Sequence, residues 1–204
     1  MFKKLYTFYV AALIVVVFVV LQVLFNLNLA WSVGSVEVQF FTSLFAHGSA
    51  EHLLGNLIAL LIFGIILEGT VGSERFLRVL LVAAVIGNLA AIGSYDAVLG
   101  LSGGIYGLIG ALMVLRPTML VWLPGLPLPM ILLGVVYTFI DLVGAFAGVG
   151  NTGHLAHLAG IGVGMYMGFV YRRAGVLGED HSFSSQDNAL LDEELDEYER
   201  RYLR

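Results

Sequence analysis

The sequence predicts an all-α polytopic membrane protein, a bundle of six transmembrane helices built as one domain. Hydrophobic residues make up 59% of the 204 residues, charged residues 12%, and the mean hydropathy is +0.91. A soluble domain of this length could not bury so much apolar surface. Uncharged apolar segments also recur along the chain, each near the length that crosses a bilayer. These segments cover residues 8–26, 52–67, 79–95, 98–115, 126–147 and 154–171.

The first segment follows two lysines and resembles the start of a signal peptide. It is longer than the apolar region of a usual signal peptide, and residues 28–30 form a poor cleavage site, so we predict a spanning helix. The second segment is short because it lies between Glu51 and Glu68. A few residues around Asp96 separate the third segment from the fourth.

The basic residues predict the orientation of the helices, because positive charge is retained on the cytoplasmic side of a membrane protein. All ten lie before the first helix, between the second and third, after the fourth or after the sixth. We therefore expect a multi-pass protein of the cell membrane with both termini in the cytosol. The heads of the second, fourth and sixth helices, meaning their N-terminal ends, would face outward. The ten residues are Lys3, Lys4, Arg75, Arg78, Arg116, Arg172, Arg173, Arg200, Arg201 and Arg204.

Charge also divides the chain into two regions. Residues 1–173 hold the predicted membrane domain, and residues 174–204 form an acidic tail that we place in the cytosol. Nine of the fifteen acidic residues follow Gly178, so the net charge of −5 reflects the tail. This pattern favours a solvated segment without a specific function. We expect the lipid bilayer as a partner and no nucleic acid.

Ser102 and His157 lie at one predicted depth. Ser102 is 14 residues from Arg116, and His157 is 15 residues from Arg172. Both would lie roughly 21 to 22 Å from the cytosolic ends of their helices. That depth is about 8 to 10 Å below the outer surface of the hydrocarbon core. A hydroxyl and an imidazole held there suggest proteolysis within the membrane. The absence of cysteine excludes a thiol nucleophile, disulfides and thiolate metal sites.

Other polar side chains are predicted at the same level of the bundle. In lipid such side chains are costly and usually mark function or a polar cavity. His52 and Asn56 are four residues apart on the second helix and therefore share one face. Tyr106 follows Ser102 by one helical turn. The remaining members of this set are His47, Asp141 and His154.

Small residues recur every four positions on the two helices that carry Ser102 and His157. Such stripes let helix backbones approach closely, which makes a hydrogen bond between Ser102 and His157 geometrically reasonable. The alternative is that the stripes only pack the bundle, because these patterns are common in membrane helices. The stripes are Gly103, Gly107 and Ala111 on the fourth helix, and Ala156, Gly160, Gly164 and Gly168 on the sixth.

The chain carries a His-x4-His-x3-Asn pattern that begins at His47, a Gly-x-Ser-Gly motif that begins at Gly100, and an Ala-His-x-x-Gly-x-x-x-Gly motif that begins at Ala156. With these three motifs the chain resembles the rhomboid intramembrane serine proteases over about residues 38–172. Any one motif is weak, since a lone Gly-x-Ser-Gly occurs by chance, but three in this order and on these helices are specific. The connection between the second and third helices also looks like that of the family. The matching residues are His47, His52 and Asn56; Gly100 to Gly103 with Tyr106; Ala156 to Gly164; and, in the connection, Glu68, Gly72-Ser73 and Phe76-Leu77.

The resemblance implies the fold and the chemistry of a rhomboid protease. Ser102 would be the nucleophile and His157 the general base, a dyad without a carboxylate. His52, Asn56 and the Ser102 backbone N–H would bind the oxyanion. Tyr106 would stack on His157 and replace the orienting acid of a soluble triad. The supporting positions would be Gly100, Gly103, His47 and Gly160.

The same resemblance implies that the substrates are transmembrane helices of other membrane proteins. They would enter sideways near the fifth helix and unwind locally before cleavage. The site would open to the outer side under a pliable loop containing Gly148, Gly150 and Gly153. No cofactor and no metal are implied. The natural substrate, the cleavage sequence and the oligomeric state are not encoded in any motif that we identify.

The chain departs from the family pattern in two places. Val38-Gln39 stand where family members often have Trp-Arg in the first outer loop, so we expect that loop to pack differently. Asp141 is an acid that the pattern does not include. We expect it to face water or a hydroxyl such as that of Tyr137 rather than to act in catalysis.

Three alternatives compete with this interpretation. A metal site could gather four histidines, but the sequence has neither the His-Glu-x-x-His nor the His-x-x-Glu-His motif. A catalytically silent rhomboid-like protein, which binds or escorts membrane helices, usually lacks the serine or the histidine, whereas this chain has both. A transporter is disfavoured because no inverted repeat or pair of broken helices is apparent. The four histidines are His47, His52, His154 and His157. For His154 we expect a position in a loop or at the start of a helix, where it faces water, and not a role as a metal ligand.

Overall fold

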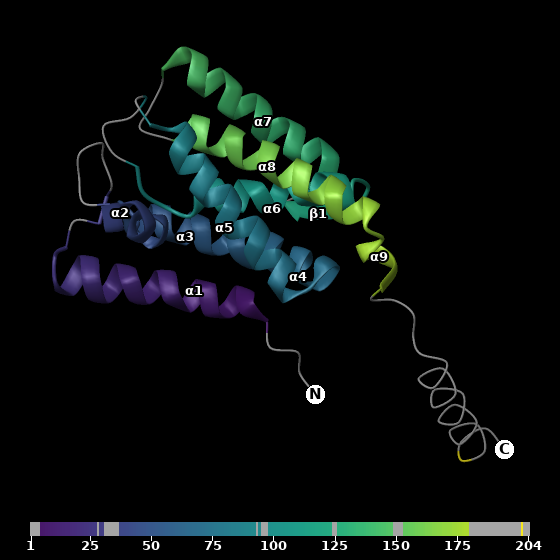
Figure 1. Cartoon of the computed structure of the whole chain (residues 1–204), viewed down its shortest axis with the longest axis horizontal. Helices are drawn as coiled ribbons and strands as arrows, with labels where there is room; N and C mark the ends of the chain where they lie inside the picture. Colours follow the sequence, from purple (N-terminus) through teal and green to yellow (C-terminus); the bar gives the residue numbers. More distant parts are fainter. Residues whose placement is uncertain are drawn as a thin grey trace.

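The structure of the chain is a computed structural model, shown in Figure 1. Long helices run side by side along one axis, with α1 and α7 at opposite edges of the view. The predicted all-α class is confirmed. The structure describes residues 5–27, 29–30, 37–92, 94, 98–123, 126–148, 153–179 and 201.

Each of the six predicted segments overlaps a helix or a continuous run of helical turns, and shorter elements connect them. In the described chain, three helical stretches are long and apolar enough to cross a membrane: Tyr6–Leu24, Ala50–Val71 and Met130–Ala147. The count of six spans therefore stays a prediction. The helices are α1 (Tyr6–Val16) with the π-helical η1 (Val17–Leu24), α2 (Glu37–Thr42) with the 3₁₀ turn η2 (Ser43–Phe45), α3 (Ala50–Ala59), the π-helical η3 (Leu60–Gly64), α4 (Ile65–Val71), α5 (Ser73–Ala90), α6 (Ser102–Leu115), α7 (Met130–Ala147), α8 (His154–Arg173) and α9 (Val176–Glu179).

Several helix boundaries differ from the prediction, and two of these differences have a clear local cause. Helix α5 begins at Ser73 rather than near residue 79, because Gly72 ends α4 with a positive φ of 83° and the next helix starts at once. Arg75 and Arg78 are therefore helical and do not lie in a linker. Helix α7 begins at Met130 rather than at residue 126, since the two prolines just before it cannot continue a helical hydrogen-bond pattern.

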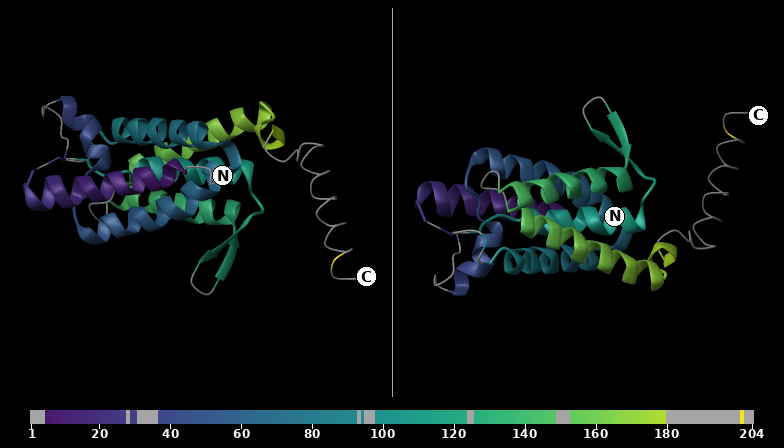
Figure 2. Two further views of the ribbon diagram at one scale, coloured as in Figure 1. Left: turned by 90° about the horizontal axis from the view of Figure 1, so that it is seen from below. Right: turned by 90° about the horizontal axis from the view of Figure 1, so that it is seen from above.

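A short β-hairpin, which the pattern of apolar segments does not predict, connects α6 to α7. Its strands are β1 (Leu120–Leu123) and β2 (Leu126–Pro129), paired antiparallel with Leu120 opposite Pro129. The hairpin projects sideways from one end of the bundle (Figure 2). Two backbone bonds at its base, Met130 N–H to Met119 O and Ile131 N–H to Pro117 O, fix the start of α7.

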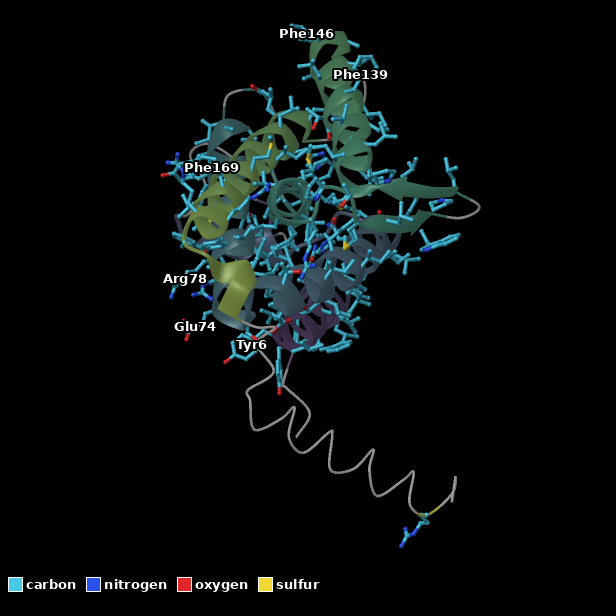
Figure 3. All side chains as sticks on the ribbon, turned by 90° about the vertical axis from the view of Figure 1, so that its right-hand side faces the viewer. Tyr6, Glu74, Arg78, Phe139, Phe146 and Phe169 are labelled. Carbon is cyan, nitrogen blue, oxygen red and sulfur yellow. The ribbon has the colours of Figure 1, made fainter. Side chains whose placement is uncertain are left out.

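Helix α7 lies at the edge of the bundle and exposes apolar side chains. Phe139 is 63% exposed and Phe146 is 86% exposed. Figure 3, which views the bundle from the end that carries α9, shows both rings pointing away from the other helices. In a membrane protein such a surface faces the acyl chains, so its exposure is expected.

Helices α6 and α8 approach each other more closely than side chains would allow. A Cβ atom added to Gly160 would collide with the carbonyl oxygen of Gly103, and one added to Gly164 would collide with that of Gly107. The two predicted small-residue stripes therefore pack against each other. This contact sets the distance between the two helices that carry Ser102 and His157.

Glu68 ties the first helix to the second predicted span. Its carboxylate accepts hydrogen bonds from the backbone N–H groups of Tyr6 (2.6 Å) and Thr7 (2.9 Å) and from the Thr7 hydroxyl (2.7 Å). These N–H groups belong to the first turn of α1, where no intrahelical acceptor exists. Glu68 is 3% exposed. A side chain from a distant segment thus caps α1 and complements the positive end of its dipole.

We expect Gly164→Ala to destabilise the bundle by about 1–3 kcal/mol, because the added methyl group meets a backbone carbonyl that cannot move aside without shifting α6. Gly162→Ala is the matched control, since nothing lies within 4 Å of its added Cβ atom. This control should be neutral or gain about 0.5–1 kcal/mol from helix propensity. Thermal unfolding in detergent measures both, and equal stabilities would contradict the close packing.

Glu68→Gln should destabilise the protein by about 1–3 kcal/mol, because the charged acceptor of three hydrogen bonds is lost and a donor replaces one oxygen. Glu74→Gln offers a comparison, since Glu74 is an exposed acid paired with Arg78 at 3.1 Å. That change should cost less than about 1 kcal/mol. Unfolding curves for the two variants should therefore separate clearly; coincident curves would show that the cap contributes little.

Candidate active site

Ser102 and His157 form a hydrogen bond at the start of helices α6 and α8. The Ser102 Oγ atom lies 2.9 Å from Nε2 of His157. His157 is 6% exposed and therefore almost fully buried. Ser102 is the first residue of α6 and His157 follows the first residue of α8 by three positions. The close packing of the two helices brings these heads together.

The ring of His157 is held on one face by an aromatic side chain. Tyr106 stacks on it with a centroid separation of 4.0 Å and an interplanar angle of 9°. Tyr106 follows Ser102 by one turn of α6, so the hydroxyl and the stacking ring come from the same helix face. Tyr137 of α7 meets Tyr106 edge to face at 5.7 Å. These contacts restrict rotation of the imidazole.

We expected Asp141 to face water or a hydroxyl such as that of Tyr137; the first alternative is wrong because the side chain is buried, and the hydroxyl that interacts with it is that of Tyr106. Asp141 is 2% exposed, and its Oδ1 atom lies 2.9 Å from Nδ1 of His157 and 2.7 Å from Nδ1 of His154. An ionised carboxylate only accepts hydrogen bonds, so each imidazole carries its proton on Nδ1. The Nε2 atom of neutral His157 is then free to accept a hydrogen bond from the Ser102 hydroxyl.

His154 is the first residue of α8, and the prediction that it faces water is also wrong. Its side chain is 13% exposed and bonds the buried acid of α7. A Cβ atom at Gly144 would collide with the His154 ring, so the missing side chain at Gly144 makes room for it. The acid, the glycine and the histidine thus fit together between α7 and α8.

Asn56 is held on the opposite side of the site by His47. The Asn56 Nδ2 group donates to Nε2 of His47 at 2.8 Å, and the other ring nitrogen donates to the carbonyl oxygen of Phe45 at 3.2 Å. Burial lowers the pKa of His47 to about 4, so its ring stays neutral and can accept the bond from Asn56. Gln22 completes the support with two bonds to the His47 backbone, at 2.8 and 2.9 Å.

Gly100 lets the chain approach His52. Its φ is +106°, and an added Cβ atom would lie 2.9 Å from Cε1 of His52, so a side chain would be both strained and crowded. The Gly100 N–H donates to the Ser43 carbonyl oxygen at 2.8 Å. His52 itself is placed at the start of α3 by the Ser49 cap, which accepts the His52 N–H at 3.1 Å.

Two adjoining cavities meet at Ser102 and His157. The first, here called the polar cavity, has a volume of about 580 Å³ and is also lined by His52, Asn56 and Gly100. The second, here called the apolar cavity, has a volume of about 260 Å³. Its walls come from α3, η3, α6 and α7 and include Ala59, Phe63, Ile105, Ile109, Tyr106 and Tyr137.

The four-histidine gathering considered above as a metal site does not form among the described residues. Among those residues, one group of side chains has potential metal-ligating atoms within 4.8 Å of one another. This group is Asp141, His154 and His157. Both histidines already hydrogen-bond to Oδ1 of Asp141 through their Nδ1 atoms. His47 instead bonds Asn56.

Several predictions fall on residues that the structure does not describe. They concern the middle of the loop before α8 with Gly150, the region around Asp96, the two N-terminal lysines and most of the acidic tail after residue 179. Val38-Gln39 belong to α2, but their side chains are not described. The division into residues 1–173 and 174–204 stays a prediction.

Known proteins similar to this chain identify its family. The Rhomboid domain family matches residues 35–174. The chain is 35% identical over 145 residues to Rhomboid-related protein 1 of Caenorhabditis elegans, covering 66% of this chain and 40% of that protein. It is 35% identical over 128 residues to Rhomboid protease GlpG of Haemophilus influenzae, covering 61% of this chain and 64% of that protein. The match thus spans less than two thirds of either relative, but it covers most of this chain, which belongs to the rhomboid family.

Proposed function

We propose that the protein is an intramembrane serine endopeptidase that cleaves transmembrane helices of other membrane proteins. The observation that carries this proposal is the 2.9 Å hydrogen bond between Ser102 Oγ and His157 Nε2 inside an apolar helix bundle. A serine hydroxyl needs a base within hydrogen-bond reach before it can attack a peptide. Membership in a family with a named protease relative supports the same reaction class.

In the proposed reaction, Ser102 Oγ attacks the scissile carbonyl carbon while its proton passes to His157 Nε2. The tetrahedral intermediate then collapses, the C–N bond breaks, and His157 gives that proton to the departing amine nitrogen. Water next attacks the acyl-enzyme ester with His157 again acting as base. This second step releases the new carboxylate and restores the Ser102 hydroxyl.

The oxyanion of each tetrahedral intermediate would be bound by His52, Asn56 and the backbone N–H of Ser102. The two side chains and Ser102 line the polar cavity together. Asn56 keeps one amide hydrogen for His47 and can direct its other toward the cavity. The Ser102 N–H belongs to the first turn of α6, where backbone donors lack intrahelical acceptors. Preorganised donors of this kind stabilise charge that develops in the transition state.

The substrate would be a membrane-spanning segment that reaches the site from the bilayer beside α7. The apolar cavity opens next to Ser102 and can take an apolar side chain of the unwound segment. Helix α7 lies at the edge of the bundle and packs few of its side chains inside it. A helix at this position can move more readily than α6, which is buried along most of its length.

We place the site toward the outer side of the cell membrane, with both termini in the cytosol. Glu74 and Arg78 lie at the end of the bundle that faces the viewer in Figure 3. At the same end the Arg172 guanidinium donates to the carbonyl oxygen of Val114, near the ends of α8 and α6. Ser102 lies at the opposite end of α6. The positive-inside rule then directs the site outward.

A catalytically silent protein that binds or escorts membrane helices is the competing function. It would need the cavities but not the hydrogen bond from Ser102 to His157. The intact pair favours the enzyme, because a buried polar pair is costly in a membrane protein unless it has a role.

Ser102→Ala and His157→Ala should each abolish cleavage of a single-span membrane protein reconstituted with the enzyme, and should abolish labelling by a fluorophosphonate. Without the hydroxyl no ester can form, and without the imidazole the hydroxyl is not activated. Ser94→Ala is the control, because Ser94 is an exposed serine outside both cavities. Unlabelled wild-type protein would support the escort function. Cleavage that survives Ser102→Ala but is abolished by a chelator would support a metal site.

Asn56→Ala should lower kcat by about 10²–10³-fold with little change in KM, because one oxyanion donor is lost while substrate binding is retained. His47→Ala should give a smaller loss, since His47 acts by holding the Asn56 amide. Steady-state cleavage kinetics in proteoliposomes measure both. An unchanged kcat in Asn56→Ala would remove this residue from the oxyanion site while leaving the assignment of Ser102 intact.

A further inference from the structure

We propose that Asp141 is a positioning residue for His157, so that the proposed nucleophile and base are completed by a carboxylate in a Ser102–His157–Asp141 chain. This inference rests on the proposed function. The three side chains come from three helices, α6, α8 and α7, and are joined by two hydrogen bonds of 2.9 Å. The two bonds use the two different nitrogens of one imidazole, which is the connectivity that a serine hydrolase triad requires.

The carboxylate selects the useful tautomer of the imidazole. Because Asp141 Oδ1 can only accept when ionised, the proton of neutral His157 lies on Nδ1. That leaves the lone pair on Nε2 directed at the Ser102 hydroxyl. When Nε2 takes the Ser102 proton, the resulting imidazolium keeps its Nδ1–H bond to a negative partner. Asp141 itself gains no proton and touches no substrate in this scheme.

Asp141 is held in place by contacts that no surface acid would have. Its Oδ1 atom also accepts from His154 Nδ1 at 2.7 Å, so two imidazoles fix its direction. Gly144, three residues further along α7, leaves the space that the His154 ring occupies. The other oxygen, Oδ2, is buried and makes no hydrogen bond with the described residues. A buried carboxylate with this set of partners is aimed at the two histidines and at no part of the solvent.

The stacked tyrosine and the carboxylate restrict His157 in different ways. Tyr106 lies parallel to the ring and fixes its plane, but a stacking contact does not distinguish Nδ1 from Nε2. The bond from Nδ1 to Asp141 makes that distinction. We therefore expect that Tyr106 alone supports part of the activity and that the acid supplies the rest.

The main test is Asp141→Asn, which keeps the shape of the side chain and removes its charge. We expect kcat for a reconstituted single-span substrate to fall by about 10²-fold, less than the about 10⁴-fold loss in a soluble triad because Tyr106 still holds the ring. KM should change less than about twofold, since no substrate contact is lost. Labelling of Ser102 by a fluorophosphonate should slow by a similar factor.

A double-mutant cycle separates positioning from a general structural role. The cycle pairs Asp141→Asn with His154→Ala, because both single variants keep measurable activity: since His154 bonds Asp141, adding His154→Ala to Asp141→Asn should cost less kcat than His154→Ala costs alone. Thr138→Val is the matched control on α7, since the Thr138 hydroxyl bonds its own helix at Gly134 and should leave kcat unchanged. His154→Ala should give a loss smaller than that of Asp141→Asn, because the bond to His157 remains.

A measurement on the unaltered Asp141 keeps the inference testable if the Asn variant does not fold. Nitrogen NMR of histidine-labelled protein should show neutral His157 protonated on Nδ1 and unprotonated on Nε2. The opposite tautomer would overturn the inference, as would wild-type kcat in a folded Asp141→Asn protein whose Ser102→Ala counterpart is inactive. Absence of cleavage and labelling in the wild-type protein would instead reject the proposed function itself.

Discussion

The close contact between α6 and α8 is the constraint on which the rest of the structure depends. Membrane helices gain no hydrophobic driving force from meeting each other in lipid, so they associate through packing and polar contacts. Here the contact is between glycines, with Gly103 and Gly107 facing Gly160 and Gly164 across the interface. Backbones at that distance place the heads of both helices side by side, and Ser102 and His157 lie at those heads.

The polar residues that flank Ser102 and His157 form two groups. On one side, Asn56 bonds the ring of His47, and Gln22 bonds the backbone of His47. On the other side, Asp141 joins the two histidines of α8. Unsatisfied polar groups are expensive in an apolar surrounding, so bonds within the protein stabilise these side chains. Satisfying them also fixes their directions, and the polar cavity lies between the two groups.

The sequence was sufficient for the helices and for the pair at their heads, because both depend on quantities that can be counted along the chain. Apolar length predicts a helix, and rise per residue predicts depth. The hairpin was missed because apolar length alone does not separate a strand from the helix that follows it, although Pro127 and Pro129 were a usable signal. The start of α5 was missed because Gly72 allows two helices to join without a linker.

The partners of Asp141 could not be predicted, because they depend on the rotation of α7 about its axis. Helix α7 has no predicted stripe of small residues that would show which of its faces meets α8. Its contact with α8 includes the buried Asp141 and the small residue Gly144. One signal was nevertheless present, since Asp141 and Gly144 share the same spacing of three residues as His154 and His157. Residues three positions apart lie on one helix face, so the face with Asp141 and Gly144 can pack against the face with His154 and His157. In the structure the acid lies between both histidines while the glycine accommodates one ring. An intramembrane acid outside a family motif is therefore better interpreted together with the residues one turn away than as an isolated charge.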